Sequence, residues 1–392
     1  NPSSEIIPID AITCGNFSVI INSKRTSHLS YKLNLVLVGA DKFNKGFGSR
    51  AHIPAIKALE KYYNFYGICT TKESSSKKLK EIHKTEKSYG NIDELVEDKK
   101  VDIISIAVRV RHHYDILWKS IKKRKIIYCE WPLCLNSSEA STIMSLAKQS
   151  KLKYHIVGTQ GRFAPSVNYL KDLLDDGKIG ELLFVKSHHM LPRFDVKENH
   201  WWSSQEEEHS GALGVASAHC LDTLQHILGN ITSLCAQTET LHAEDKYIDT
   251  KNKFKWSAKD YVNILFYVKD KIPGSLTVCN LTNSNIGFEL LVVGTKGHIK
   301  LVMPYYVSYS PGLLYMSLDG IEKHIEIPKK YLKINNLSPN SPGYNISYSL
   351  LNLYKCIKEN KNVSPNFDDG YLLHKVVENI KLSHIERKWI NI

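Results

Sequence analysis

Short apolar runs alternate with segments of helical periodicity between residues 33 and 130, and this alternation restricts the fold more than any other feature of the chain. The first run, Leu33 to Val38, stops at Gly39, and a helical pattern of apolar residues follows it. Further strands are predicted at 65–70, 101–108 and 126–130, and helices at 74–83, 92–98 and 114–123. The alternation predicts an α/β fold with a parallel sheet and right-handed crossovers, in which ligands bind at the carboxyl ends of the strands.

The length of 392 residues exceeds what one hydrophobic core usually supports, so two domains are expected. After residue 180 the pattern changes to longer β-rich segments at 182–188, 263–268, 275–281 and 288–293. The sequence Gly294-Thr-Lys-Gly297 after the last of them predicts a hairpin turn. Two helices are predicted to close the chain, at 344–359 and 369–387.

The composition excludes several classes of protein. With 42% hydrophobic and 23% charged residues the chain is typical of a globular protein, and its apolar runs are far too short to span a membrane. The eight cysteines form no Cys-x-x-Cys pair, which predicts reduced thiols in a cytosol or nucleus. The net charge of +12 comes from lysines spread along the chain beside acidic residues, so nucleic acid binding is not expected. Residues 1–31, with one strand-like run at 17–21, are predicted to be a poorly ordered extension that is neither a signal nor a transit peptide.

The segment after the first strand is rich in glycine. It reads Gly39-Ala-Asp-Lys-Phe-Asn-Lys-Gly46-Phe-Gly48-Ser-Arg50 and departs from the Gly-x-Gly-x-x-Gly fingerprint because an insertion displaces the second glycine. Gly39 suits the tight turn, Gly46 and Gly48 would let backbone N–H groups approach a pyrophosphate, and a helix from about residue 49 would point its positive end at the phosphates. The candidates for cofactor binding in this loop are Gly39, Lys45, Gly46 and Gly48. The alternative is an ordinary loop of an α/β domain.

The second strand ends Gly67-Ile-Cys-Thr-Thr71-Lys72 and has no Asp or Glu where a ribose 2′-hydroxyl would be bound. Thr71 and Lys72 instead offer a hydroxyl and a cation that suit a 2′-phosphate, so NADP is favoured over NAD. The alternative is that Lys72 is a solvated surface lysine.

Several short motifs follow one another in a fixed order along most of the chain. They are Ala107-Val-Arg-Val-Arg-His112-His113-Tyr114, Ile127-Tyr-Cys-Glu130-Trp131-Pro132, Gly158-Thr-Gln160-Gly161-Arg162, Asp176-Gly177-Lys-Ile-Gly180 and His219-Cys-Leu-Asp222. On these motifs the chain resembles the glucose-fructose oxidoreductase and inositol dehydrogenase (Gfo/Idh/MocA) family, and more closely the branch that includes the fungal galactose-regulon repressor. The family has Glu-Lys-Pro where this chain has Glu130-Trp131-Pro132, and the branch carries Glu-Trp.

The resemblance implies a Rossmann domain that binds NAD or NADP, followed by an α+β domain whose large open, mostly antiparallel sheet forms the substrate wall and a dimer face. On this basis residues 32–157 form the Rossmann domain and residues 158–392 the second domain, with the helix at 369–387 lying back toward the first. The resemblance adds further residues to the cofactor site, and it makes His113 an orienting residue of the nucleotide loop. These added residues are Val108, His113, Glu130, Trp131, Gln160 and Arg162.

Hydride transfer from a secondary alcohol needs a group that takes the hydroxyl proton. In the family the lysine of Glu-Lys-Pro and a later histidine do this work, and the lysine position is Trp131 here. The family's Asp four residues before the histidine is Val215. His219 and Asp222 remain, and their spacing places both on one face of a helix. The catalytic candidates are therefore His219, Asp222 and Trp131, with Arg162, His188, His189 or His200 as supplements.

Two functions follow from these substitutions. In the first, the chain is an NAD(P)-dependent oxidoreductase that acts on a polyol, a sugar or a sugar-derived carbonyl, with His219 as the acid-base group and Trp131 stacked on the nicotinamide or a sugar ring. In the second, the chain binds NAD(P) without turnover and acts as a regulatory sensor, as the galactose-regulon repressor is thought to do. His219 could also be a hydrogen-bonded core histidine, and Trp131 a bulky residue that fills space.

The expected partners are a sugar-like small molecule and a second copy of the chain. A homodimer would cover the apolar face of the open sheet, because large exposed apolar patches are rare on monomers. A protein partner is an additional possibility if the function is regulatory. No membrane contact and no metal site are expected, and the predicted location is the cytoplasm, or the nucleus for a regulator.

Overall fold

The computed structural model describes residues 32–392 except 44 and 310, so the predicted extension at 1–31 lies outside the described residues. The first domain is a six-stranded sheet in the order β3-β2-β1-β4-β5-β6, and all of its neighbouring strands run parallel. The strands are β1 (Leu33–Val38), β2 (Tyr63–Cys69), β3 (Lys87–Tyr89), β4 (Ile103–Ile106), β5 (Ile126–Glu130) and β6 (His155–Gly158). This order confirms the predicted α/β fold, although the sequence pattern missed β3 and β6.

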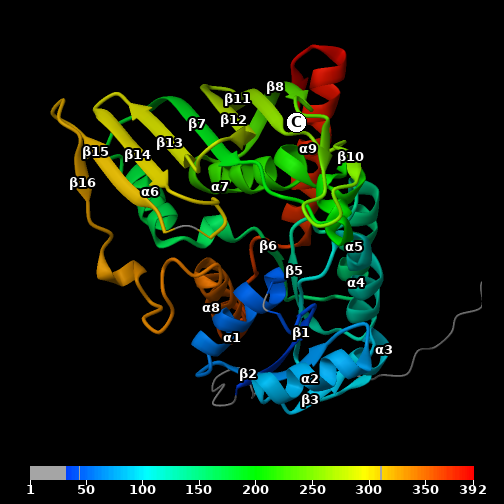
Figure 1. The fold of residues 1–392 in the computed structure, drawn as a ribbon. Helices are drawn as coiled ribbons and strands as arrows, with labels where there is room; N and C mark the ends of the chain where they lie inside the picture. Colours follow the sequence, from blue (N-terminus) through cyan, green and yellow to red (C-terminus); the bar gives the residue numbers. More distant parts are fainter. Residues whose placement is uncertain (1–31, 44, 310) are drawn as a thin grey trace, which may run out of the picture.

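Helices cover both faces of this sheet (Figure 1). They are α1 (Ile53–Ala58), α2 (Glu73–His83), α3 (Ile92–Glu97), α4 (His113–Lys122) and α5 (Ser137–Gln149). The start of α5 shows how local sequence fixes a boundary, since the side chain of Asn136 accepts a hydrogen bond from the backbone N–H of Glu139 (2.9 Å). The helical turn Gly48–His52 precedes α1, so the glycine-rich loop leads directly into a helix.

The second domain is built on a nine-stranded sheet in the order β16-β15-β14-β13-β7-β12-β11-β8-β17, in which only the β7–β12 pair is parallel. Its strands are β7 (Leu182–Pro192), β8 (Ile231–Glu239), β11 (Tyr261–Val268), β12 (Ile272–Thr282), β13 (Gly287–Gly294), β14 (Gly297–Met303), β15 (Leu313–Ser317), β16 (Lys323–Ile325) and β17 (Ile390–Asn391). A separate hairpin pairs β9 (Glu244–Lys246) with β10 (Lys253–Lys255). The predicted turn is confirmed, because Gly294 pairs with Gly297 where β13 meets β14.

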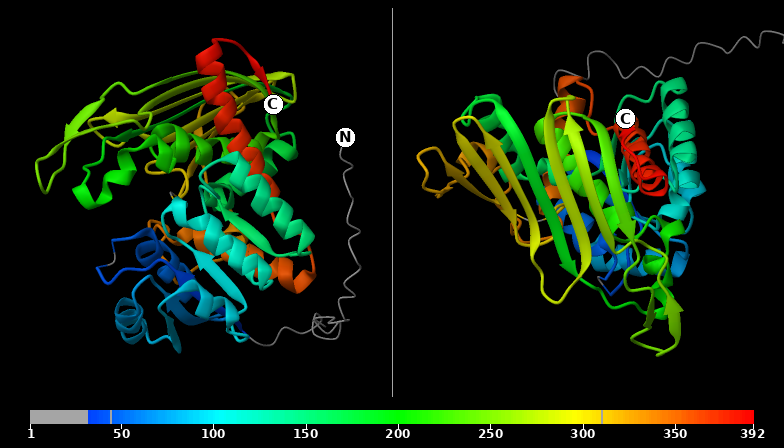
Figure 2. Two further views of the ribbon diagram at one scale, coloured as in Figure 1. Left: turned by 90° about the vertical axis from the view of Figure 1, so that its right-hand side faces the viewer. Right: turned by 90° about the horizontal axis from the view of Figure 1, so that it is seen from above.

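One face of the large sheet is buried and the other is open. Along β11 the residues Val262, Ile264, Phe266 and Val268 are buried, and those between them face outward. The buried face packs on α6 (Pro165–Asp175) and α7 (Ala218–Leu228), whereas no helix lies over the outer face in the view from above (Figure 2). The mostly antiparallel, open sheet is the one that the family resemblance implied.

The two C-terminal helices join the domains. In α8 (Tyr344–Glu359), Ile346, Leu350 and Leu353 belong to the core that also contains β1 and α1 of the first domain. The last helix, α9 (Phe367–Glu386), packs on α5 and on β8, and so touches both domains. None of the helices in the described part of the chain combines the length and the apolar character needed to cross a membrane.

Candidate nucleotide-binding and catalytic site

The glycine loop closes tightly on the carboxyl edge of the first sheet. Gly39 has a φ of +100°, and a Cβ there would lie 2.5 Å from the carbonyl oxygen of Ala107, just after β4. A Cβ on Gly48 would collide with the Gly39 carbonyl. The backbone of the loop therefore comes close to the strand end at Gly39 and Gly48, as in a dinucleotide-binding turn, and the role of these glycines at a pyrophosphate stays a prediction.

The inserted residues fold around Asp41, which the sequence reasoning missed. Its carboxylate accepts hydrogen bonds from the backbone N–H groups of Phe43 (2.9 Å), Lys45 (3.1 Å) and Gly46 (2.6 Å). Burial would raise the pKa of Asp41, but these N–H donors bring the pKa below its usual value. The N–H of Gly46 already donates to the carboxylate of Asp41, so it is not free to bind a phosphate. This corrects the expectation that the N–H of Gly46 approaches a pyrophosphate. An Asp that precedes a turn is the signal that could have predicted this arrangement.

The end of β2 carries the residues expected at the adenosine ribose. Thr71 and Lys72 are exposed, and Lys72 is the residue directly before α2. The hydroxyl of Thr70 donates to the carbonyl of Lys72 (2.8 Å), which fixes this turn. Glu73, which follows, forms an i,i+4 ion pair with Lys77 (2.7 Å). Both Thr71 and Lys72 are therefore accessible to a ligand at this edge.

A buried hydrogen-bond network holds Glu130 at the end of β5. Gln160 donates from Nε2 to both carboxylate oxygens (2.6 Å each), and His52 contacts Oε1 through Nε2 (2.8 Å). His52 also contacts the hydroxyl of Ser105 through Nδ1 (2.9 Å), so it links α1, β4 and β5. Glu130 and Gln160 thus meet as the resemblance implied, while His52 was missed because nothing local in the sequence pairs it with a residue 78 positions away.

His113 fixes the loop beside the predicted nicotinamide position. Its Nδ1 lies 2.8 Å from the carbonyl oxygen of Pro132, and its Nε2 lies 3.0 Å from that of Val108. Burial lowers the pKa of His113, and a neutral ring donates through only one of these nitrogens. The ring ties the segment after β4 to the segment after β5, and its role in orienting a nucleotide loop stays a prediction. In the described residues no group of His, Cys, Asp and Glu could hold a metal ion.

Trp131 lies inside the protein and is only 5% exposed. Its indole N–H donates to the carbonyl of Gly214 (2.9 Å), and its ring packs on His374 of α9 (4.5 Å between centroids) and on His209 (5.8 Å). This geometry corrects the expectation that Trp131 stacks on a nicotinamide or sugar ring, because both histidines already occupy its surroundings. The tryptophan packs the end of the first sheet against the second domain, which agrees with the alternative that Trp131 is a bulky residue that fills space.

Asp222 and Arg162 form a buried ion pair. The guanidinium reaches both carboxylate oxygens, with Nε 2.8 Å from Oδ2 and the second nitrogen in contact with Oδ1. Burial raises the pKa of Asp222, and the charge of Arg162 opposes that rise. A carboxylate held by two donors is poorly placed to exchange a proton with His219. The structure therefore favours a structural role for Asp222. Arg162, which had been expected at the cofactor, is held by the same ion pair.

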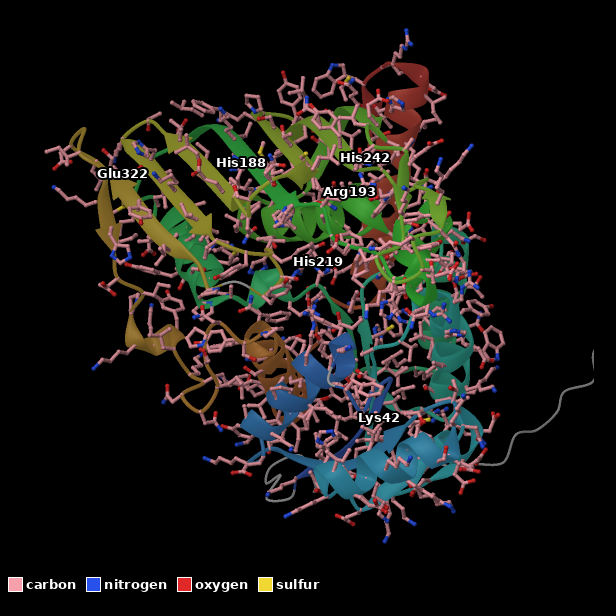
Figure 3. All side chains as sticks on the ribbon, viewed as in Figure 1. Lys42, His188, Arg193, His219, His242 and Glu322 are labelled. Atoms are coloured by element: carbon pink, nitrogen blue, oxygen red, sulfur yellow. The ribbon has the colours of Figure 1, made fainter. Side chains whose placement is uncertain are left out.

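His219 lies at the start of α7, between the two domains (Figure 3). It is buried, its Nδ1 has no hydrogen-bond partner, and burial lowers its pKa to about 4. The ring stands nearly perpendicular to that of Tyr306 at 5.9 Å. Val215, half-buried in the helical turn Ala212–Ser217, provides no proton-transferring group nearby. His219 is thus neutral at pH 7 and able to accept a proton.

Of the histidines expected to supplement His219, only His189 lies near it. His189 points to the buried face of β7 and contacts Tyr306 (4.9 Å between ring centroids), and burial and the nearby His219 lower its pKa to about 3. His188 points to the opposite face because side chains alternate along a strand. His200 packs on Trp202 in the turn Glu198–Ser204. A hollow of about 460 Å³ between α1 and α2 is lined by Asp41 but by neither His219 nor Trp131.

These features define a two-domain α/β protein with a dinucleotide-type glycine loop and a neutral histidine between its domains. Residues 33–159 match the model of the oxidoreductase family with the NAD-binding Rossmann fold, and residues 167–300 match that of the GFO/IDH/MocA C-terminal domain. The chain belongs to the GFO/IDH/MocA oxidoreductase family.

Its relatives are distant but cover nearly its full length. An uncharacterised oxidoreductase of Synechocystis is 23% identical over 88% of this chain and 94% of its own. A super-repressor mutant of Gal80p from Saccharomyces cerevisiae has a similar fold, with a TM-score of 0.82 and 18% identity over 92% of this chain and 98% of that one. Levoglucosan dehydrogenase, solved with NADH and levoglucosan, has a TM-score of 0.80 and 20% identity over 92% and 99% of the two chains.

Proposed function

We propose that this protein is an NAD(P)-dependent oxidoreductase that acts on a polyol, a sugar or a sugar-derived carbonyl. The observation that carries the proposal is the neutral, buried His219 between a nucleotide-binding domain and the wall of the second sheet. The close approach of Gly39 and Gly48 to the strand ends fits a dinucleotide-binding turn, because a side chain at either position would collide with the backbone and push the loop away from the sheet. The nicotinamide would supply the hydride acceptor or donor.

The chain's own contribution is binding, orientation and proton transfer. Glu130, Gln160 and His113 fix the two loops that border the nicotinamide position. His219 takes the hydroxyl proton of an alcohol in one direction and returns a proton to the oxygen in the other. Since the lysine and aspartate positions are Trp131 and Val215, His219 works alone, and a missing acid-base group typically lowers a rate by about 10²- to 10⁴-fold.

A second candidate function is a nucleotide-binding regulator without turnover. It is favoured by the packing of Trp131, whose indole N–H and both neighbouring histidines commit the lysine position to a contact between domains. In this case NAD(P) would alter a surface recognised by a protein partner. A regulator would act in the nucleus or cytoplasm and the enzyme in the cytoplasm.

The discriminating experiment combines binding with turnover. Calorimetry with NADPH, NADH and their oxidised forms measures nucleotide affinity, and absorbance at the nicotinamide band measures turnover over a panel of sugars and polyols. We expect turnover in the wild type and its loss in His219→Ala, with nucleotide affinity retained. His226→Ala, on the same helix, is the matched control. Tight nucleotide binding without turnover on any substrate supports the regulator, and no nucleotide binding at millimolar concentration contradicts both functions.

We also propose that the cofactor is NADP. Support comes from the exposed Thr71 and Lys72 at the end of β2, where the carboxylate of the adjacent Glu73 is paired with Lys77. Lys72→Ala should weaken NADPH binding by about tenfold and leave NADH binding unchanged, because only NADPH carries the 2′-phosphate. Equal effects on the two nucleotides would contradict the preference.

Finally, we propose a homodimer through the outer face of the large sheet. Phe184 of β7 and Leu265 and Tyr267 of β11 are exposed there, and the half-buried Leu291 and Val293 of β13 lie on the same face. An apolar sheet face of this kind is suited to a second copy related by a two-fold axis. Light scattering at micromolar concentration should give twice the chain mass, and Leu265→Lys should give the monomer. A monomeric wild type would remove this proposal.

A further inference from the structure

The hollow between α1 and α2, which we name the α1–α2 groove, is lined largely by apolar side chains. Its volume is about 460 Å³. Ile53 of α1 and Leu79 of α2 line it and are buried, whereas Ile82 of α2 also lines it and is 57% exposed. An apolar hollow of this size, bordered by a large side chain that stays in water, is typical of a surface that receives a partner.

The charges that border the α1–α2 groove are mostly positive. Lys42 and Lys57 line it, together with His83 at the end of α2. Neither lysine has an ion-pair partner in the part of the chain that the structure describes. Asp41 also lines the groove, but its carboxylate is held by backbone N–H groups of its own loop. A partner that suits this groove is therefore apolar and acidic.

The sequence before the first domain has this composition. Residues 1–31 lie outside the described residues, so only their sequence can be compared with the groove. Residues 1–22 contain six isoleucines, and their two charged residues are Glu5 and Asp10. The first basic residue in the sequence is Lys24. The stretch thus combines apolar side chains with two negative charges and no positive one, which complements the lining of the groove.

The start of β1 lies close enough to the α1–α2 groove for this stretch to reach it. The backbone N–H of Leu33 donates to the carbonyl of Tyr62 (3.0 Å), and Tyr62 follows Lys57, in the last turn of α1, by five residues. Five residues span at most about 18 Å, whereas the eleven residues 22–32 span about 36 Å when extended. A tether of this length would hold the stretch near the groove at an effective concentration of about millimolar.

We propose that residues 5–21 bind in the α1–α2 groove of the same chain. In this arrangement the apolar run at 17–21 covers Ile82, and the two carboxylates of the segment lie beside Lys42 and Lys57. Binding removes apolar surface of both the run and the groove from water, and because the segment is tethered, the entropic cost of association is small. The proposal does not rest on the proposed function.

Hydrogen exchange on the full chain measures whether the segment is bound. We expect the backbone amides at 17–21 to exchange at least about tenfold more slowly than in a free peptide of residues 1–22. Ile82→Gln should abolish this protection, because it removes the apolar contact at a position that is 57% exposed and so leaves the core in place. Ile385→Gln, at a 74% exposed position on α9, is the matched control.

Cross-linking with a carbodiimide locates the segment, because this reagent joins a carboxylate directly to a neighbouring lysine. We expect the two carboxylates of the segment to be joined to Lys42 or Lys57 of the same chain. Lys61 is exposed and adjacent to Tyr62, which holds the start of β1. A segment that is tethered but not bound would therefore react with Lys61 as readily as with Lys57.

Four outcomes overturn the proposal. Exchange at 17–21 as fast as in the free peptide shows that the segment is not bound, and equal cross-linking yields at Lys57 and Lys61 show the same. Protection that persists in Ile82→Gln places the run on another surface. Cross-links that double the mass of the denatured chain assign the groove to the segment of a second copy. None of these outcomes depends on nucleotide binding, so the proposed function is tested separately.

Discussion

A fall in pH from 7.5 to 5.5 should remove most of the stability of this protein. Burial lowers the pKa of four histidines, His155, His209, His219 and His226, to about 4, and that of His189 to about 3. In the unfolded chain each has a pKa near 6.5. The folded state therefore binds fewer protons below pH 6.5. The contribution of these histidines to the free energy of unfolding is fully present above pH 6.5 and falls as the pH drops toward 4. It changes little further once the histidines of the folded protein also become protonated.

The magnitude follows from the difference between the two states. At pH 5.5, one unit below the unfolded pKa, each histidine costs about 1.4 kcal/mol, so five together cost about 7 kcal/mol. A folded domain has a total stability of about 5–15 kcal/mol. The loss is thus comparable to the whole free energy of unfolding, and if relaxation around the charged rings halves it, the remaining loss of about 3.5 kcal/mol is still a substantial part of that free energy.

The assay is urea unfolding followed by tryptophan fluorescence at pH 7.5, 6.5 and 5.5. His226→Gln should reduce the number of protons taken up on unfolding by about one, because glutamine does not titrate. His242→Gln, at an exposed position, is the matched control. A free energy of unfolding that is constant between pH 7.5 and 5.5, or that falls only below pH 4, would show that these histidines are protonated in the folded protein and would refute the reasoning.

Three further substitutions test the site. Trp131→Lys should destabilise the fold by about 3–5 kcal/mol and give no faster turnover than the wild type, because it removes a buried ring and places an ammonium beside two buried histidines. A variant that is as stable as the wild type in urea titration and turns over substrate faster would contradict this. Gly48→Ala should weaken nucleotide binding at least tenfold in calorimetry, because its methyl collides with Gly39, and unchanged affinity would mean that the loop is not the phosphate site. Arg162→Met should lower the free energy of unfolding by about 3–5 kcal/mol, because it leaves Asp222 buried and unpaired. The double variant Arg162→Met, Asp222→Leu should lose less stability. Equal losses for the two variants in urea unfolding would argue against a structural ion pair.

The parts of this fold that could be predicted from sequence are those set by neighbouring residues. The apolar run of β1 and the glycine that ends it mark a strand and a tight turn, and the Asn136 cap marks the start of α5. The two C-terminal helices were also predicted closely, since α8 spans Tyr344–Glu359 and α9 spans Phe367–Glu386. Strand β3 has only three residues and was missed, because so short a segment carries no periodicity.

Side-chain partners that come from distant segments could not be predicted in this way. His52 and Glu130 are 78 positions apart, and Cys134 and His374, whose ring accepts the Cys134 N–H, are 240 apart. Such contacts depend on how the crossovers and α9 return to the sheet. The pairing of Arg162 with Asp222 shows the same limit, because the two residues were placed in different roles until the structure brought them together.

Trp131, at the position where the family resemblance implies a lysine, belongs to a buried cluster of side chains. A lysine needs a polar surrounding, whereas Trp131 is enclosed by His209, His374 and the carbonyl of Gly214. The imidazole of His374 in turn accepts the backbone N–H of Cys134, and burial and the neighbouring His209 and His113 keep its pKa well below the usual value. These neutral rings pack against an indole but carry no negative charge to offset the burial of an ammonium. A lysine at this position would therefore need the histidines around it to change as well.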